Sequence, residues 1–308
     1  MSKIIVIVGP TASGKTDLSI RLAKEFNGEV INADSTQIFQ GTDIATNKIT
    51  TAEMQGIKHH LLSIKAVNET YSVADFQRDA RNCIAAIQQQ KKTPIVVGGT
   101  GLYINALLYQ YNFLKFEHIP GFEKQFEQLS NLEVWQKLAA LDHQAALKIH
   151  PNNRYRTIRA LEILQSTGQT KTDIIENNHQ YFYESQDLII IGLAPNREQL
   201  YQCINQRVLR LIKQGLFIEI TNAYNATDFQ LTQALTCIGG KEIIQYLMQK
   251  INYETCISLM QKNNRHYARR QFTWFKNQLP DCHWFEFKME NFDNACEDII
   301  KLIKRIIV

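Results

Sequence analysis

The fold class of this chain is decided by one stretch near its start, Gly9-Pro10-Thr11-Ala12-Ser13-Gly14-Lys15-Thr16. It matches the pattern G-x-x-x-x-G-K-[ST] without a mismatch, and it lies between an apolar run, 4–8, and an amphipathic segment, 17–26. This order predicts strand, loop and helix, which is the context that a phosphate-binding loop requires. Backbone N–H groups and the helix N-terminus then face one anion, while Lys15 adds a charge and Thr16 a hydroxyl suited to Mg²⁺. A glycine-rich turn without a ligand is the alternative.

The strand and helix pattern repeats along the chain. Short apolar runs at 29–33, 94–97 and 188–191 are typical of buried parallel strands. Helical patterns lie between them, such as the one that Ser72 begins, with Asp75 three residues on as a capping-box acid. Strands that alternate with helices predict an α/β fold, here an open, P-loop NTPase-like parallel sheet flanked by helices.

The pattern changes from about Phe113 to Gln186, where Gln-, Asn- and Leu-rich helical stretches replace the β-branched runs. We therefore predict a P-loop catalytic core over 1–112 and 187–308, with a helical C-terminal part, and a helical insertion domain over 113–186. A short strand is expected at 283–287, followed by an amphipathic last helix.

Composition is that of an ordinary globular protein. Of 308 residues, 44% are hydrophobic and 21% are charged, which argues against disorder and against a disulfide miniprotein. The apolar run at 4–8 is too short for a signal peptide or a spanning helix, and six cysteines without a CxxC pair predict buried free thiols. We therefore expect a cytoplasmic monomer without a membrane partner. The net charge of +4 is too weak to indicate nucleic-acid binding by itself.

Two further polar loops follow predicted strands. Asp34-Ser35-Thr36-Gln37 comes after the second strand, and Gly98-Gly99-Thr100-Gly101-Leu102-Tyr103 comes after the run at 94–97. Both should emerge beside the phosphate-binding loop, at the carboxyl edge where open α/β sheets bind ligands. From composition alone, Asp34 is as consistent with a helix cap or an Mg²⁺ ligand, and Thr100 is more often a cap for the helix that follows.

The distribution of charge is more informative than its sum. From Thr255 to Pro280 the chain has no acidic residue, but it has five basic residues interleaved with aromatic ones, Lys262, Arg265, Arg269, Arg270 and Lys276. Helical spacing places most of them away from an apolar stripe made of Ala268, Phe272, Phe275 and Leu279. A second acid-free set lies in the predicted insertion, Lys148, Arg154, Arg156 and Arg159. Two such sets would suit the two sides of an RNA stem, although a solvated helix face explains the first set taken alone.

Several longer blocks resemble one family. In chain order they are GPTASGKT at 9–16, DSTQIFQGTDI at 34–44, HHLL at 59–62, YSVADF at 71–76, VVGGTGLY at 96–103, HPNNRYRTIRALE at 150–162, CIGGKE at 237–242 and RRQFTWF at 269–275. Together they resemble the tRNA dimethylallyltransferase family, or tRNA isopentenyltransferases, from about Lys3 to Trp284. The resemblance implies transfer of a dimethylallyl group from dimethylallyl diphosphate to the exocyclic amine of the adenosine just 3′ of the anticodon.

The resemblance also implies roles for individual residues. Asp34 corresponds to the general base at the amine, Thr100 to its partner that holds the reacting groups, and Lys15 to a catalytic cation. The donor diphosphate corresponds to Gly9, Pro10, Thr11, Ala12, Ser13, Gly14, Lys15 and Thr16, with Mg²⁺ as the cofactor at Thr16. The predicted contacts with the tRNA anticodon stem-loop are Asp34, Ser35, Thr36, Gln37, Thr100, Tyr155, Arg156, Thr157, Ile158, Arg159, Thr236, Cys237, Ile238, Gly239, Gly240, Lys241, Arg265, Arg269 and Arg270.

The sequence departs from the family pattern at several positions. Ala45 and Asn47 stand where Gly and Ala are usual, Lys58 and Ser63 where Pro and Asp are usual, Asn153 where Asp is usual and Gly240 where Tyr is usual. None of these changes removes a proposed catalytic group. They concern loop geometry and RNA contacts.

The implied chemistry suits these residue types. An adenine amine becomes acidic only as the new C–N bond forms, and a carboxylate that takes the proton contributes about 10² to 10⁴ in rate. A leaving diphosphate needs preorganised donors, such as loop amides and Lys15. A base in an anticodon loop must also leave its stack, which costs a few kcal/mol.

Three other functions use some of the same features. A P-loop nucleotide kinase would use Asp34 to activate a hydroxyl and would need ATP, but no lid with paired arginines is evident. An adenylate isopentenyltransferase acting on free nucleotide would have little use for the insertion or the basic helix. An NTP-gated RNA-binding module leaves Asp34 and Thr100 without a shared role.

Overall fold

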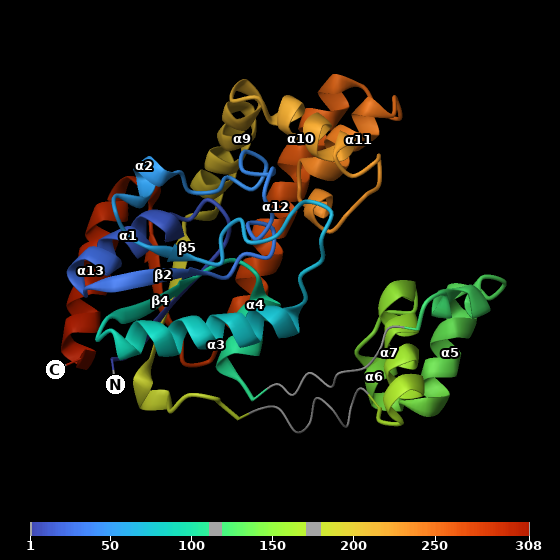
Figure 1. Cartoon of the computed structure of the whole chain (residues 1–308), viewed down its shortest axis with the longest axis horizontal. Coiled ribbons are helices and arrows are strands. Elements are labelled where there is room, and N and C mark those ends of the chain that lie inside the picture. Colours follow the sequence, from blue (N-terminus) through green and yellow to red (C-terminus); the bar gives the residue numbers. More distant parts are fainter. Residues whose placement is uncertain (1, 111–118, 171–179, 308) are drawn as a thin grey trace. The chain divides into compact units, whose positions relative to one another are not determined.

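The computed structural model describes residues 2–110, 119–170 and 180–307. The chain divides into two compact units (Figure 1). Met1–Leu107 and Tyr183–Val308 form the first unit, and Leu108–Phe182 forms the second. The insertion predicted over 113–186 overlaps the second unit.

The first unit is built on one parallel sheet with the strand order β3-β2-β4-β1-β5-β6. The strands are β1 (Ile4–Val8), β2 (Gly28–Asn32), β3 (His59–His60), β4 (Thr93–Val97), β5 (Leu188–Pro195) and β6 (His283–Phe287). This order confirms the predicted open α/β sheet. In the sheet, Ile7 pairs with Val97 on one side and with Ile191 on the other, so the strands' carboxyl ends lie at one edge.

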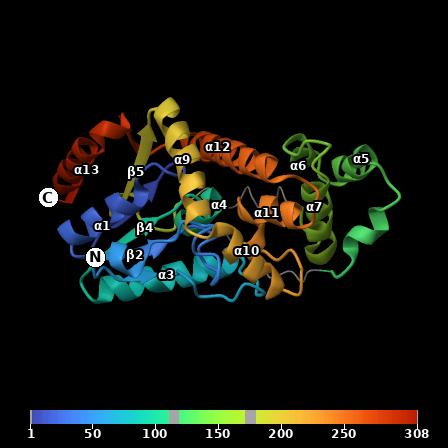
Figure 2. The same ribbon diagram turned by 90° about the horizontal axis from the view of Figure 1, so that it is seen from above.

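Helices cover both faces of this sheet (Figure 2). On one face, α1 (Lys15–Glu25) and α13 (Phe292–Ile307) share an apolar core with the strands, in which Leu18, Ile191 and Ile299 are buried. On the opposite face, α3 (Val73–Gln89) packs on β2 and β4. The short α2 (Thr51–Met54) and α4 (Gly101–Leu108) follow β2 and β4 along the chain.

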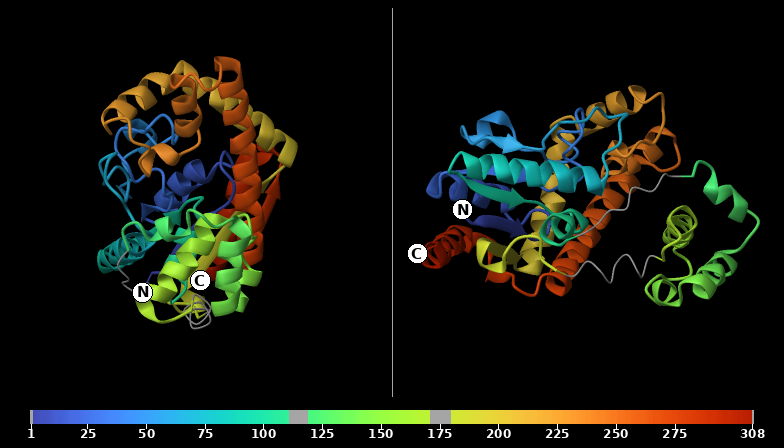
Figure 3. Two further views of the ribbon diagram at one scale, coloured as in Figure 1. Left: turned by 90° about the vertical axis from the view of Figure 1, so that its right-hand side faces the viewer. Right: turned by 60° about the horizontal axis from the view of Figure 1, so that its bottom comes forward.

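A second apolar core lies among the C-terminal helices of this unit. They are α9 (Arg197–Lys213), α10 (Leu216–Asn225), α11 (Gly240–Leu247) and α12 (Tyr253–Gln278). Val208, Ile220, Ile243 and Met260 are buried together in this core. The long α12 also packs against α9 (Figure 3), which directly follows β5 along the chain.

The second unit is helical. It contains α5 (Asn131–Leu141), α6 (His143–Leu147), α7 (Arg154–Thr167) and a short 3₁₀ helix at Phe122–Phe126. Its own core includes Phe122, Val134, Leu138 and Leu161. The starts of α5, α6 and α7 are capped by the side chains of Ser130, Asp142 and Asn153.

Some boundaries differ from the predicted ones for physical reasons. The helix predicted at 17–26 begins at Lys15, because the end of the phosphate-binding loop already forms the first helical turn. The strand predicted at 188–191 continues to Pro195, because β6 pairs with it from Ile191 to Pro195. The strand β3 was not predicted, since a two-residue His-His strand has no apolar run to reveal it.

Candidate functional site

The phosphate-binding loop leads from β1 into α1 at the carboxyl edge of the sheet. Gly14 has φ +88°, and a Cβ there would lie 2.4 Å from the Phe292 ring, so the position requires glycine. Among the described residues, no side chain caps the start of α1, and the buried Ser13 hydroxyl has no hydrogen-bond partner. Both features leave donors available to an anion at this loop.

Two cations lie at the loop. The Lys15 ammonium donates to Pro10 O at 2.7 Å, and Arg207 from α9 donates to Thr11 Oγ1 at 2.6 Å. Burial lowers the pKa of Lys15 to about 8, with Asp34 opposing the shift and Arg207 adding to it. Burial likewise lowers the pKa of Arg207 to about 10. Two desolvated cations side by side favour the binding of an anion between them.

Asp34 lies beside the same two cations. Its Oδ1 accepts from the Thr36 N–H at 3.0 Å and from the Thr36 hydroxyl at 2.7 Å. No hydrogen bond joins Oδ2 to a residue that the structure describes. Residues 35–38 form a turn, so Asp34 holds a turn and caps no helix. The carboxylate therefore has one anchored oxygen and one that can accept a proton.

Thr100 ties the Asp34 loop to the glycine-rich loop. Its Oγ1 accepts from the Ser35 N–H at 3.0 Å and donates to Ser35 Oγ at 3.2 Å. The hydroxyl is thereby committed across the two loops, so the alternative that it serves as a helix cap is not supported. Two of the three polar loops predicted to meet at the carboxyl edge are joined in this way.

The middle of α12 completes the site. Gln271 is 5% exposed, accepts from the Thr11 N–H at 2.8 Å and donates to Gly99 O at 2.9 Å. The Tyr267 hydroxyl forms hydrogen bonds with Thr100 and Gln271, and burial together with Asp34 raises the pKa of Tyr267. Neither Gln271 nor Tyr267 was predicted as a site residue, nor was Arg207. A Gln beside an apolar stripe, and one Arg among three in the amphipathic helix α9, are weak sequence signals.

The basic residues of α12 separate into two groups. Lys262, Arg269 and Arg270 are exposed. In contrast, Arg265 is half-buried and donates to Asn205 Oδ1 at 2.5 Å. Lys276 is also exposed, but its ammonium lies 4.5 Å from the centre of the Trp284 ring. The Arg265 guanidinium is thus already engaged within the protein, and its contact with RNA stays a prediction.

The basic set of the second unit is smaller than predicted. Tyr155 is 79% exposed and Arg156 is exposed. Arg154 instead donates to the backbone carbonyls of Phe126 and Leu129, and Arg159 pairs with Glu162 at 2.5 Å. Four further residues that were predicted to contact RNA differ in how deeply they are buried. Thr157 and Cys237 are buried, while Ile158 and Ile238 are half-buried, and all four stay predicted RNA contacts.

The structure gives a reason for some departures from the family pattern. A Cβ at Gly240 would lie 2.5 Å from Leu235 O, so a larger residue requires a different path for this segment. The side-chain oxygen of Asn47 accepts from Arg210 at 3.0 Å, a hydrogen bond that alanine could not make. The Ala45 N–H donates to Glu219 Oε2 at 2.8 Å, but glycine would make the same bond, so nothing in the structure explains this change. Thr236 and Lys241 at the ends of the segment are exposed, whereas Gly239 is buried.

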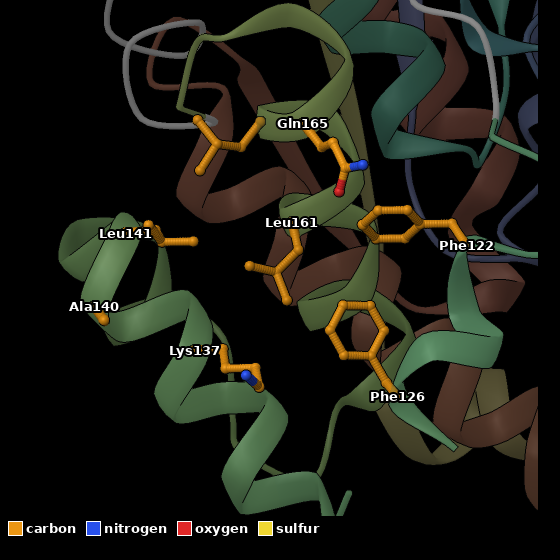
Figure 4. Close-up of a pocket in the computed structure, with 8 residues that line it drawn as sticks. Phe122, Phe126, Lys137, Ala140, Leu141, Leu161 and Gln165 are labelled. Atoms are coloured by element: carbon orange, nitrogen blue, oxygen red, sulfur yellow. The ribbon is translucent and has the colours of Figure 1, made fainter. Parts of the chain in front are cut away.

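A cavity of about 510 Å³ lies elsewhere, within the second unit (Figure 4). Its lining is mostly apolar and consists of Phe122, Phe126, Lys137, Ala140, Leu141, Leu161, Leu164 and Gln165. None of these lining residues is a carboxylate, so the cavity lacks the proton acceptor that the predicted chemistry needs.

Two searches of the described residues concern metals and membranes. Over 2–110, 119–170 and 180–307, no group of three or more His, Cys, Asp or Glu side chains could hold a metal ion. No helix within the same ranges is long and apolar enough to cross a membrane. All six cysteines are free thiols. Cys237, Cys256, Cys282 and Cys296 are buried, as predicted, whereas Cys83 and Cys203 are half-buried, so the prediction is wrong for these two.

An open parallel sheet with a phosphate-binding loop, two cations and a carboxylate at its carboxyl edge defines a P-loop α/β protein with a site for a phosphorylated ligand. The family model for IPP transferase matches residues 37–278. The chain belongs to this family.

Relatives and solved structures agree with this assignment. The chain is 43% identical over 304 residues to the tRNA dimethylallyltransferase of Anoxybacillus flavithermus, covering 98% of this chain and 96% of that one. It is 42% identical over 290 residues to the Bacillus subtilis tRNA dimethylallyltransferase, covering 92% and 90%. The crystal structure of the Bacillus halodurans tRNA isopentenylpyrophosphate transferase superposes with a TM-score of 0.76 at 38% identity, covering 100% and 97%. A eukaryotic dimethylallyltransferase acting on tRNA gives a TM-score of 0.80 at 31% identity, covering 93% and 74%.

Proposed function

We propose that this protein is a tRNA dimethylallyltransferase. It transfers the dimethylallyl group of dimethylallyl diphosphate to the exocyclic amine of the adenosine 3′ of the anticodon and releases diphosphate. The observation that carries the proposal is the placement of Asp34 beside Lys15 and Arg207, which puts a proton acceptor next to an anion site. A phosphoryl transferase also needs an anion site, but family membership favours transfer of the allyl group.

In the proposed step, the adenine nitrogen forms a bond to C1 of the donor as the bond from C1 to the diphosphate oxygen breaks. The free Oδ2 of Asp34 takes the proton that the amine loses, and Thr36 holds Oδ1 in place at 2.7 and 3.0 Å. The Thr100 hydroxyl fixes the Asp34 loop through Ser35. Lys15, Arg207 and the loop amides stabilise the charge that develops on the diphosphate.

The site also fits Mg²⁺, the proposed cofactor. Mg²⁺ usually binds through one or two protein oxygens and fills the rest of its shell with phosphate oxygens and water. The exposed Thr16 hydroxyl at the start of α1 provides such an oxygen beside the anion site, without the closed cluster that a purely protein-bound metal needs. When bound there, Mg²⁺ would neutralise charge on the donor diphosphate.

For the acceptor, each unit contributes exposed groups of its own. In the first unit Lys241, Arg269 and Arg270 are exposed, and in the second unit Tyr155 and Arg156 are exposed. Arginines suit phosphates, and an exposed aromatic ring suits an unstacked base. We assign these residues to the tRNA anticodon stem-loop and place the protein, as a monomer, in the cytoplasm, where its free thiols stay reduced.

The direct test is incubation with dimethylallyl diphosphate, Mg²⁺ and unmodified tRNA, followed by mass analysis of the nucleosides. The expected product is an adenosine that is heavier by one dimethylallyl group at the position after the anticodon. Modification at another nucleotide, or transfer of phosphate from ATP in a parallel reaction, would contradict the proposal.

A further inference from the structure

Gln271 joins two loops of the site that come from distant parts of the chain. Its Oε1 accepts from the Thr11 N–H at 2.8 Å, and its Nε2 donates to Gly99 O at 2.9 Å. Thr11 belongs to the loop that faces the proposed donor, and Gly99 directly precedes Thr100. Because Gln271 is only 5% exposed, water does not readily replace these hydrogen bonds.

One face of α12 is shaped to these loops. Tyr267, Gln271 and Trp274 follow each other at spacings of four and three, which places them on the same side of the helix. Tyr267 forms a hydrogen bond with Thr100. A Cβ at Gly99 would lie 2.1 Å from the Gln271 amide nitrogen, and a Cβ at Gly101 would lie 2.4 Å from the Trp274 ring. The glycines therefore allow α12 to lie directly against the loop.

We propose that Gln271 is a positioning residue that sets the spacing between the donor loop at Thr11 and the base loop at Asp34 and Thr100. The proposal rests on the function proposed above. Transfer requires the attacked carbon and the attacking nitrogen about 3 to 3.5 Å apart, and a misplacement of about 1 Å costs on the order of 10²-fold in rate. A primary amide supplies one acceptor and one donor in a fixed geometry, so it can hold both loops at once.

Two substitutions at this position separate the parts of the amide. Gln271→Glu retains an acceptor for the Thr11 N–H but loses the donor to Gly99 O. Gln271→Met has nearly the same length and makes neither bond. Gly99→Ala disturbs the same contact from the other loop, since its methyl group would meet the Gln271 amide.

The matched control is Gln261→Met. Gln261 lies on the same helix, and its amide donates to the backbone carbonyl of Asn205 at 3.3 Å, on α9. It touches neither the donor loop nor the base loop in any hydrogen bond of the described residues. Loss of helix packing or of a side-chain hydrogen bond should therefore lower the stability of both Met variants. Loss of loop spacing should lower the rate of Gln271→Met only.

The experiment measures four quantities for the parent and each variant: the melting temperature, the dissociation constants for dimethylallyl diphosphate and the tRNA stem-loop, and the single-turnover rate with both saturating. We expect Gln271→Met and Gly99→Ala to lose about tenfold to a hundredfold in rate, with both dissociation constants within about threefold of the parent. Gln271→Glu should fall between the parent and Gln271→Met. Gln261→Met should keep the parental rate.

Two results would overturn the proposal: a parental rate for folded Gln271→Met, which would leave Gln271 with a purely structural role, or an equal rate loss in Gln261→Met. Hydrogen exchange at the Thr11 amide gives a readout that needs no turnover. Exchange should accelerate in Gln271→Met and stay unchanged in Gln261→Met. Equal exchange in the parent and both variants would also refute the positioning role of Gln271. A parent that exchanges as expected but prenylates no RNA would count against the proposed function instead.

Discussion

The two faces of α12 differ in what their polar groups contact. On one face, Tyr267 and Gln271 are turned inward and bonded to the loops that carry Thr100 and Thr11. In contrast, Arg269 on the opposite face is exposed, and so is Arg270, whose guanidinium lies 5.9 Å from the centre of the Tyr267 ring at the edge of the inward face. A group whose bonds are all made within the protein can affect the rate only through geometry, whereas an exposed cation is available to a phosphate and affects binding. Substitutions of the inward residues of α12 should therefore lower the rate, whereas substitutions of its exposed arginines should weaken RNA binding.

The largest effect is expected inside the site, at Asp34. Asp34→Asn keeps the size of the side chain and can still accept from Thr36, but it removes the proton acceptor. We expect a loss of at least about 10² in single-turnover rate, with donor and RNA binding retained. Asp298→Asn on α13, which removes an exposed carboxylate, is the control. A parental rate for Asp34→Asn would make Asp34 a turn-holding residue only.

The pH dependence of anion binding should test whether Lys15 contributes its charge to the anion site. Because burial lowers the pKa of Lys15 to about 8, the free protein loses this charge as the pH rises through 8. A bound anion favours the charged form, so the affinity for inorganic diphosphate should be constant below pH 8 and fall toward tenfold per pH unit above it. Lys15→Arg keeps its charge throughout. Diphosphate ionises in the same way in both titrations, so the difference between the parent and Lys15→Arg reports the charge of Lys15 alone. Equal pH profiles for the two proteins would refute the lowered pKa of Lys15.

The same pKa shift has a consequence for stability. The folded state holds fewer protons at Lys15 than the unfolded state between about pH 8 and the ordinary pKa of 10.5. Unfolding free energy attributable to Lys15 should therefore rise with pH in that window.

On the exposed side, neutralising Arg269 and Arg270 together should weaken tRNA binding without changing donor binding. The slope of log affinity against log salt should fall by about one unit for each lost phosphate contact. Neutralising Lys301 and Arg305, two exposed cations on α13, removes the same charge elsewhere. If both double variants change the salt slope equally, the basic face of α12 is an ordinary solvated surface.

The smallest effect is expected at a helix cap that belongs to neither face. Ser72 Oγ accepts from the Asp75 N–H at 3.1 Å at the start of α3. Ser72→Ala should lower the unfolding free energy by about 1 kcal/mol. Denaturant titration measures this loss, and the saturated rate of the folded protein should not change. A large rate loss would mean that global stability, and not loop geometry, controls the kinetics.

The sequence predicted those features whose physical cause is local. The loop at Gly9 to Thr16, the capping box at Ser72 and the strand at 283–287 follow from short patterns, and all three are present. Arg207 and Gln271 could not be predicted in this way. Their roles depend on contacts with Thr11, 196 and 260 residues away in sequence, which only the folded chain brings together.

The charge pattern of the sequence indicates where basic residues cluster, but not which of them are bonded to other groups of the protein. The acid-free stretch of α12 does expose Arg269 and Arg270, yet the same reasoning included Arg265, which Asn205 holds. In the second unit, Arg154 donates to the backbone carbonyl of Leu129, which lies outside the acid-free stretch. Arg159 pairs with Glu162, which comes just after that stretch. Whether a cation is available depends on such partners.

The central claim is that the site prenylates an adenosine within tRNA, and that contacts remote from the reacting base contribute to its recognition. The most direct test compares acceptors side by side, with labelled dimethylallyl diphosphate and Mg²⁺ at equal acceptor concentrations. We predict label in an anticodon stem-loop that has adenosine after the anticodon, and negligible label in AMP, ADP or ATP. Equal or greater label in a free nucleotide would contradict the claim and indicate an adenylate transferase.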